Sequence, residues 1–192
     1  LNAWNNGKIT SACLPGLTNL RKLDAGGNCG ISDANLHLLA NLEELNAWRN
    51  PKITSACLPT LTSIRKLDAG GHCGISNDNI HLLTNLEELD VSDNPKITSV
   101  NLPGLTNLRQ LIAAKDSGIS DKNHHLLTNL EELDVWDNSK ITSACLPELT
   151  NLKKLDAACT CGITNKNLHL LTKLEELDTY NNPKVTSACL PG

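Results

Sequence analysis

The fold is decided by two consecutive segments, LNAWNNGKITSACLPGLTNLRK (residues 1–22) and LDAGGNCGISDANLHLLANLEE (residues 23–44). Both contain the pattern L-x-A-x-x-N-x-x-I, and the pair recurs every 44 residues until residue 192. Units of 22 residues therefore start at positions 1, 23, 45, 67, 89, 111, 133, 155 and 177. A fixed period of this kind is typical of a solenoid, so we predict a single repeat domain over residues 1–192. Neither end has a polar capping unit, so we expect a fragment of a longer chain.

The repeat resembles the leucine-rich repeat family, whose pattern is L-x-x-L-x-L-x-x-N-x-L, and the resemblance covers all nine units. The sixth position departs from the family pattern, because smaller residues replace its leucine: Ala3, Ala25, Ala47, Ala69, Val91, Ala113, Val135, Ala157 and Thr179. The CGI and NPKIT turns are also similar to leucine-rich repeats of amoebae and their giant viruses. The resemblance implies an α/β fold, a right-handed solenoid with a parallel concave sheet and short helices or turns on the convex side.

Packing arguments lead to the same architecture. One coil cannot bury its own leucines, so coils must stack, with each short L-x-A strand about 4.8 Å from the next. Identical residues then form columns inside the solenoid. One column contains Leu17, Leu39, Leu61, Leu83, Leu105, Leu127, Leu149 and Leu171. Another contains Ile9, Ile31, Ile53, Ile75, Ile97, Ile119, Ile141, Ile163 and Val185.

Polar turn residues are expected to hold the coils together. In the odd units, which start at 1, 45, 89, 133 and 177, the column is Asn6, Asn50, Asn94, Asn138 and Asn182. A buried amide can both donate and accept, so this column can satisfy turn backbone groups coil after coil. The even units have Asn28, His72, Asp116 and Thr160 instead, and we expect these turns to be more exposed.

Glycine, proline and possible capping residues predict the form of the turns. Positive φ is predicted at four glycines, namely Gly30, Gly74, Gly118 and Gly162. Ser32 or Asp33 is available as a helix cap in the first even unit. Prolines in the odd units favour short turns over long helices, at Pro15, Pro59, Pro103, Pro147 and Pro191.

Charges alternate just before the strands. Acidic pairs precede the odd strands at residues 43–44, 87–88, 131–132 and 175–176. Basic residues precede the even strands at 21–22, 65–66, 109 and 153–154. On stacked coils each acidic pair lies between basic residues, which would fix the register even though exposed pairs contribute only ~0–1 kcal/mol each.

The cysteines are predicted to be buried thiols. Cys13, Cys57, Cys145 and Cys189 form one column, and Cys29, Cys73 and Cys161 form another. Members of a column lie at least two coils apart, about 10 Å or more, whereas a disulfide needs Cα atoms within about 7 Å. Reduced thiols favour an intracellular, cytoplasmic location. Cys159 is the cysteine expected on the open face.

No chemistry of catalysis or metal binding is expected. His37, His81, His125 and His169 form a column too widely spaced to share one zinc ion, and His124 is read as a local defect in a leucine column. The sequence has no convergent nucleophile or acid–base cluster, so we predict no enzyme, no cofactor and no metal. A net charge of −4 argues against nucleic acid, and no apolar run is long enough to span a membrane.

The four aromatic residues all occupy one column, at Trp4, Trp48, Trp136 and Tyr180. Strand residues alternate faces, so this column is expected on the concave side, where each ring can lie across a small residue of the next coil. Exposed Trp and Tyr are also frequent binding hot spots. Outward positions vary between copies and carry an acidic stripe. The predicted contact residues are Trp4, Trp48, Arg49, Asp90, Asp93, Lys115, Asp134, Trp136, Asp137 and Tyr180.

Three functions remain open at this point. The first is a binding module that recognises a protein or peptide of basic and apolar character through the concave face. The second is a structural solenoid that self-associates head to tail through its open ends. The third is an engineered repeat scaffold.

Overall fold

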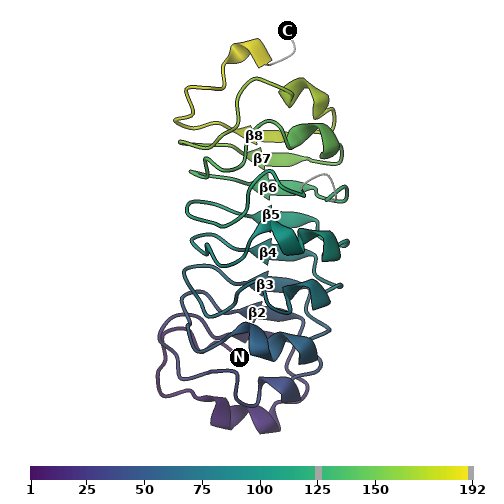
Figure 1. Ribbon diagram of the computed structural model, residues 1–192. Helices are drawn as coiled ribbons and strands as arrows, with labels where there is room; N and C mark the ends of the chain where they lie inside the picture. The colour runs from purple at the N-terminus through teal and green to yellow at the C-terminus, as the bar shows by residue number, and fades with distance from the viewer. Residues whose placement is uncertain (124–126, 190–192) are drawn as a thin grey trace.

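The computed structural model describes residues 1–123 and 127–189. It is an elongated stack of coils that runs from the N-terminus at one end to the C-terminus at the other (Figure 1). The predictions for His124, His125 and Pro191 lie outside the described residues, as does the burial predicted for the side chain of Cys189.

Eight three-residue strands form one parallel sheet in chain order. They are β1 (Lys22–Asp24), β2 (Glu44–Asn46), β3 (Lys66–Asp68), β4 (Glu88–Asp90), β5 (Gln110–Ile112), β6 (Glu132–Asp134), β7 (Lys154–Asp156) and β8 (Glu176–Asp178). Each of strands β1 to β7 pairs with the residues 22 positions later, as Leu23 does with Leu45. The first unit adds a single bridge between Asn2 and Asp24.

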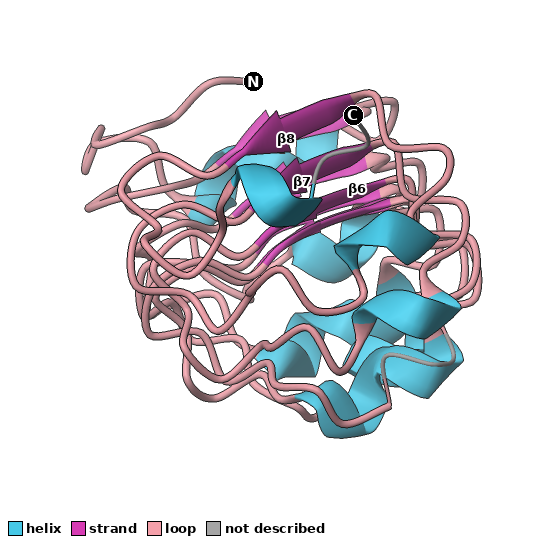
Figure 2. Cartoon of the chain, turned by 90° about the horizontal axis from the view of Figure 1, so that it is seen from above, coloured by secondary structure: helices cyan, strands magenta, loops and turns pink. Residues whose placement is uncertain are grey.

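The helices of the described chain are all short 3-10 turns. In the odd units they are η1 (Ser11–Gly16), η3 (Ser55–Thr60), η5 (Ser99–Gly104), η7 (Leu146–Glu148) and η9 (Ser187–Cys189). In the even units they are η2 (Leu36–Leu38), η4 (Ile80–Leu82) and η8 (Leu168–Leu170). Viewed from above, the strands lie along one side of the coil and most of the helical turns lie opposite (Figure 2). The described residues contain no helix long and apolar enough to cross a membrane.

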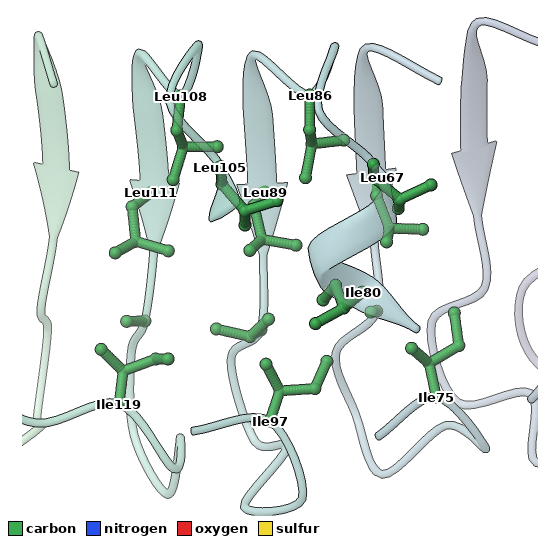
Figure 3. Packing of buried hydrophobic residues seen from close by; sticks show 14 of the residues in the cluster. Leu67, Ile75, Ile80, Leu86, Leu89, Ile97, Leu105, Leu108, Leu111 and Ile119 are labelled. Carbon is green, nitrogen blue, oxygen red and sulfur yellow. The ribbon is translucent and has the colours of Figure 1, made fainter. Parts of the chain in front are cut away.

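The core is aliphatic and continuous along the stack. Leucines from the strands, the turns before them and the helical side meet isoleucines from the turns after the strands (Figure 3). The two predicted columns are buried in the middle coils, while Ile9, Leu17 and Val185 near the ends are only partly buried. Burying these residues contributes about 25 cal/mol per Å² of apolar surface, so the coils stabilise one another only when stacked.

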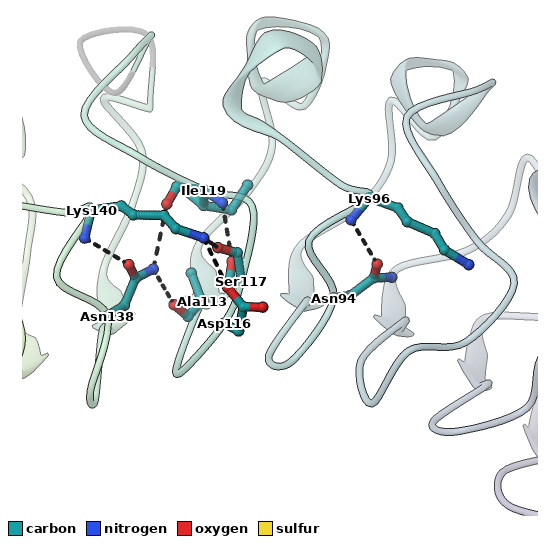
Figure 4. A network of polar contacts seen from close by, with 8 residues as sticks. All are labelled: Asn94, Lys96, Ala113, Asp116, Ser117, Ile119, Asn138 and Lys140. Carbon is teal, nitrogen blue, oxygen red and sulfur yellow. Dashed lines mark hydrogen bonds and ion pairs between the residues drawn. The ribbon is translucent and has the colours of Figure 1, made fainter.

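The odd-unit asparagines form the predicted ladder. Asn138 Nδ2 donates to the carbonyls of Ala113 at 2.7 Å and Ile119 at 3.4 Å in the preceding even coil (Figure 4). Its Oδ1 accepts from the Lys140 amide at 2.9 Å. The same pattern recurs at Asn50, Asn94 and Asn182, all of which are buried. Each ladder amide therefore joins an odd coil to the even coil before it.

Asn6 departs from the prediction of a buried ladder, because it is exposed. No coil precedes it in the structure, and within the described residues the only hydrogen bond of its side chain is the one that Oδ1 accepts from the Lys8 amide, at 3.1 Å. The even-unit substitutes Asn28, His72, Asp116 and Thr160 are exposed as predicted.

The even turns are closed by buried residues one position further along. The thiols of Cys29, Cys73 and Cys161 donate to the carbonyl four residues earlier, at 2.9 to 3.1 Å. Those carbonyls, of Ala25, Ala69 and Ala157, also accept from the ladder amides. The second cysteine column is thus part of the coil-to-coil network, which the sequence analysis did not predict.

The prediction of positive φ at Gly30, Gly74, Gly118 and Gly162 is wrong. Among described glycines, only Gly27 and Gly71 have positive φ. The four predicted glycines are required for close approach instead. A Cβ at Gly74, for example, would lie 2.5 Å from the Ile53 carbonyl oxygen of the preceding coil. The left-handed position falls on a turn residue just after the strand, occupied by Arg49, Asp93, Lys115, Asp137 and their equivalents.

The predicted capping by Ser32 or Asp33 is also wrong. Helix η2 begins after Asn35, and no side chain caps it. Asp33 accepts from the Thr54 amide at 2.7 Å and from its hydroxyl at 2.6 Å, so it joins two coils. A side chain suited to cap a helix is used here to bridge between units.

Candidate functional site

The outward side of the sheet carries the predicted charge ladders. Arg21 pairs with Glu43 at 2.7 Å, and the equivalent residues pair through the later coils, as Arg109 does with Glu131. Directly on the strands, Lys22 pairs with Glu44 at 2.7 Å and Lys66 with Glu88 at 2.6 Å. These pairs are exposed and contribute little each, but they confirm the predicted alternation of charge between neighbouring coils.

A row of carboxylates follows these ladders at the last residue of each strand. The positions in register are Asp24, Asn46, Asp68, Asp90, Ile112, Asp134, Asp156 and Asp178, so the carboxylates are interrupted at Asn46 and at Ile112. Neighbouring strands lie about 4.8 Å apart, so adjacent carboxylates repel one another. At every position except Ile112, the side-chain Oδ1 accepts the amide two residues later, as Asp134 does from Trp136 at 2.8 Å. The row therefore also fixes the turn that follows each strand.

Crowding and burial raise the pKa values of the central carboxylates. Burial and the neighbouring charge of Asp90 raise the pKa of Asp68 to about 7. Burial raises the pKa of Asp90, and burial together with the charge of Asp156 raises that of Asp134. Ionising these carboxyl groups in the folded chain therefore costs free energy, and a nearby cation would lower that cost.

Two adjoining depressions lie on this face. One is lined by strands β2 to β5 and the other by β5 to β8. They share Gln110 and Ile112, so the half-buried Ile112 stands as an apolar point between acidic residues on both sides. The interruption of the acidic row at Ile112 is visible in the sequence, but its place between two depressions is not.

The aromatic column lies at the edge of the sheet, in the turns of the odd units, where Trp48, Trp136 and Tyr180 follow strands β2, β6 and β8. The backbone N–H of each aromatic residue donates to the side chain two residues earlier. Trp48 N, for example, donates to Asn46 Oδ1 at 2.9 Å. The rings of Trp4 and Trp48 lie against Gly26 and Gly70 of the next coil, where a Cβ would collide with them. The predicted contact between ring and small residue is therefore confirmed.

The rings differ in exposure. Trp48 and Trp136 are half-buried, whereas Trp4 is 41 % exposed and Tyr180 is 69 % exposed. Successive rings are two or four coils apart, because Ser92 occupies the intervening position, so they form separate points along an edge and not one cluster.

Charged residues accompany two of the rings. The Arg49 guanidinium lies 5.9 Å from the centre of the Trp48 ring, and Lys115 Nζ lies 5.1 Å from that of Trp136. Lys115 also pairs with Asp93 at 3.5 Å. On its other side, Trp136 Nε1 donates to Cys159 Sγ at 3.1 Å. Cys159 is half-buried at this edge, beside the ring.

The predicted contact residues thus fall into two strips. Asp90 and Asp134 lie in the acidic row on the strands. The other eight lie at the turn edge beside it: Trp4, Trp48, Arg49, Asp93, Lys115, Trp136, Asp137 and Tyr180. Sequence reasoning missed Gln110 and Ile112, which join the two depressions.

The remaining candidates for chemistry are dispersed. Within residues 1–123 and 127–189, no group of three His, Cys, Asp or Glu side chains could hold a metal ion. His37, His81 and His169 are exposed, as predicted. The seven cysteines with described side chains are free thiols, and Cys29, Cys57, Cys73, Cys145 and Cys161 are buried. Cys13 is exposed, contrary to the prediction, because no coil covers it on the side where Cys57 is covered.

Comparison with known proteins identifies the repeat. An internalin C2 from Listeria monocytogenes matches 97 % of this chain and 80 % of its own, with a TM-score of 0.73 and 27 % sequence identity. Internalins share the single parallel sheet built from short repeated strands. The chain has the leucine-rich repeat solenoid fold.

Two further solved structures share the leucine-rich repeat fold. The functional domain of InlJ from Listeria monocytogenes, which includes a cysteine ladder, has a TM-score of 0.62 and 22 % identity, over 85 % of this chain and 40 % of that one. A chain of the yeast Rad7–Elc1 complex has a TM-score of 0.68 and 17 % identity, over 91 % of this chain and 53 % of that one. No protein-family model matches this leucine-rich repeat chain, and no curated protein matches it.

Proposed function

We propose that this leucine-rich repeat protein is a non-catalytic scaffold that binds an extended protein segment of basic and apolar character on its concave face. The observation that carries the proposal is the acidic row interrupted by Ile112 at the junction of two depressions. An apolar side chain of the partner would contact Ile112, while lysine or arginine side chains on either side would meet the carboxylates. Charge complementarity of this kind favours specificity and fast association.

The raised pKa values support a cationic partner. The central carboxylates repel one another, and Asp68 has a pKa of about 7 because of burial and Asp90. A bound ammonium or guanidinium group favours the ionised carboxylate, so binding releases protons. The affinity therefore increases as the pH rises through about 7, which is the sign expected when the bound state holds fewer protons.

The size of the face suits a short peptide. From Asp68 to Asp156 the sheet crosses four strand spacings, or about 19 Å. An extended chain advances about 3.3 Å per residue, so about six residues would cover this distance. The aromatic edge beside the row would supply hot-spot contacts at Trp48 and Trp136, with Arg49 and Lys115 fixing the local charge.

The structural neighbours support protein partners in general. The yeast neighbour was determined as a complex of Rad7 with Elc1, two proteins. At 17 % identity this similarity concerns the fold, so the choice of face and partner chemistry depends on the residues described above.

Selection of peptides from a random display library tests the proposal directly. We expect the enriched sequences to place an apolar residue between basic residues, and to bind more tightly at pH 8 than at pH 6. Ile112→Asp should weaken binding, because a carboxylate replaces the apolar side chain that the partner would contact. Trp136→Ala should also weaken binding, because it removes an aromatic contact at the edge of the sheet. Leu82→Ala is the matched control, since Leu82 is an exposed apolar residue on the opposite, convex side.

Enriched peptides that are acidic would contradict the proposal, as would peptides that bind Ile112→Asp as well as the parent chain. Loss of binding in Leu82→Ala alone would place the site on the convex side. Circular dichroism of each variant separates loss of binding from loss of fold.

A further inference from the structure

Strand β5 differs from its equivalents at both of its outward positions. The strands that lead into the other even units, β1, β3 and β7, all have the sequence Lys-Leu-Asp. Strand β5 has Gln-Leu-Ile, with Gln110 in place of the lysine and Ile112 in place of the aspartate. One strand in the middle of the concave face has therefore lost both of its charges.

Lys66 on β3 shows what a lysine does at the first of these positions. Its Nζ lies 2.6 Å from Glu88 Oε1 on the next strand. A hydrogen bond from Lys66 to Glu88 and the charges of Glu88 and of Glu44, on the strand before, raise the pKa of Lys66. One ammonium group therefore stabilises the carboxylates of both neighbouring strands.

Gln110 does not replace this cation. It stands in register with Glu88 on β4 and with Glu132 on β6, and its Nε2 donates to Glu132 Oε2 at 3.1 Å. Within residues 1–123 and 127–189, no hydrogen bond joins Gln110 to Glu88. The lysine on the other side of Glu132, Lys154, lies 4.0 Å from it but 3.3 Å from Glu176. The charge ladder is thus one cation short at β5.

The second position of β5 has acidic neighbours as well. Ile112 stands in register between Asp90 and Asp134. The carboxylates of β4 and β6 therefore surround two half-buried, uncharged side chains, Gln110 and Ile112. The same two residues line both depressions of the face, so this arrangement lies where the depressions meet.

We infer that strand β5 sets the register of the bound segment: a lysine or arginine of the partner takes the place of the missing lysine beside Gln110, and an apolar side chain packs on Ile112. The inference rests on the proposed function, and it names the contact that specifies the position of the partner. The two contact points are two residues apart on one strand, or about 6.6 Å. A basic and an apolar group within this distance of each other would fit the site.

Other registers are disfavoured by the neighbouring strands. A segment displaced by one strand would place its apolar side chain against Asp90 or Asp134. A segment displaced by two strands would place its cation against Lys66 or Lys154, which already occupy the ladder. Specificity of this kind depends on repulsion in the wrong registers as much as on attraction in the right one.

The test compares two variants of the whole chain that change the charge of the concave face by the same amount. The probe is the basic peptide most enriched in the display selection, synthesised with a fluorophore, and fluorescence anisotropy measures its affinity at physiological ionic strength. Gln110→Lys gives β5 the lysine of its equivalents and should weaken binding about tenfold or more, because the cation of the peptide loses its place between two carboxylates. Glu44→Gln is the matched control.

Glu44 lies on β2, three strand spacings or about 14 Å from β5, so at this ionic strength Glu44→Gln should weaken binding less than about twofold. A second arm replaces each basic residue of the peptide by glutamine in turn. One of these replacements should weaken binding to the parent chain about tenfold but leave binding to Gln110→Lys unchanged, because the two changes remove the same contact.

The outcomes separate the inference from the proposed function. Equal weakening by Gln110→Lys and Glu44→Gln, with the basic peptide still bound by the parent chain, would overturn the inference and leave the proposed function standing. A parent chain that binds no basic peptide would overturn both. Circular dichroism of each variant shows whether the fold is retained.

Discussion

Replacement of one ladder asparagine by alanine measures what joins the coils. Asn94 is fully buried, and its Nδ2 donates to the carbonyls of Ala69 at 2.6 Å and Ile75 at 3.1 Å. Asn94→Ala leaves both carbonyls without this donor inside the core. The Ala69 carbonyl keeps the Cys73 thiol as a donor, so the main cost falls on the Ile75 carbonyl. A buried polar group without a partner costs about 1–3 kcal/mol, which is the predicted loss. This is a large part of the free energy of unfolding of a typical domain.

The chain supplies a matched control in Asn6→Ala. Asn6 Oδ1 accepts the Lys8 amide at 3.1 Å, as Asn94 Oδ1 accepts the Lys96 amide at 3.1 Å, so both substitutions remove the same local bond. Asn6 makes no bond to another coil through its amide nitrogen among the described residues, and water replaces the lost contact. We therefore expect Asn6→Ala to cost less than about 1 kcal/mol.

Urea denaturation followed by circular dichroism and tryptophan fluorescence measures both variants. Equal losses in the two variants would refute the reasoning, because the coil-to-coil bonds would then contribute nothing beyond the local turn. Separate transitions for the two probes in Asn94→Ala would indicate that the stack divides at the substituted coil.

Three further predictions test the packing and the titrating groups. Gly74→Ala should destabilise the chain by about 1–3 kcal/mol in a urea titration, because the added Cβ would lie 2.5 Å from a carbonyl oxygen of the preceding coil. Gly16→Ala is the control: a Cβ there has nothing within 4 Å, so stability should change by less than about 0.5 kcal/mol. Asp68→Asn should stabilise the chain relative to the parent at pH 8 but not at pH 4, because a carboxyl with a folded pKa of about 7 loses stability as it ionises between about pH 4 and pH 7; an equal effect at both pH values would refute this. Thiol labelling of the folded chain, mapped by mass spectrometry, should modify Cys13 first and leave Cys57 unmodified, since Cys13 is exposed and burial raises the pKa of Cys57 to about 12; labelling of both at one rate would contradict the structure.

Periodicity made the architecture predictable. The 22-residue unit places Leu23, Leu45 and Leu67 in register along the sheet, and the same spacing places Asn50 and Asn94 in one buried column. These residues face identical surroundings in every copy, so one correct unit predicts the whole stack. The alternation of charge before the strands was predictable for the same reason.

The turns were less predictable because two requirements favour glycine for different reasons. Gly74 is needed because a neighbouring backbone leaves no room for a side chain, not because of its φ. The left-handed position three residues after the strand is filled by Arg49 and Asp93, neither of which is buried, at a modest conformational cost. Sequence alone does not distinguish a glycine required for space from one required for φ.

The candidate site was predictable only as a face. The alternation of strand residues placed Asp90 and Asp134 outward, but the closeness of the carboxylates depends on the register between coils. The place of Ile112 between two depressions depends on the seven strands β2 to β8 at once. Such properties arise from the stacked surface and not from one unit.

The central claim, that the concave face is the binding surface, is tested most directly by mapping amide hydrogen exchange in the presence of a selected basic peptide. The account predicts slower exchange in strands β4 to β6 and in the turns that carry Lys115 and Trp136. Slower exchange confined to the convex helices η2, η4 and η8, with the strands unchanged, would contradict it.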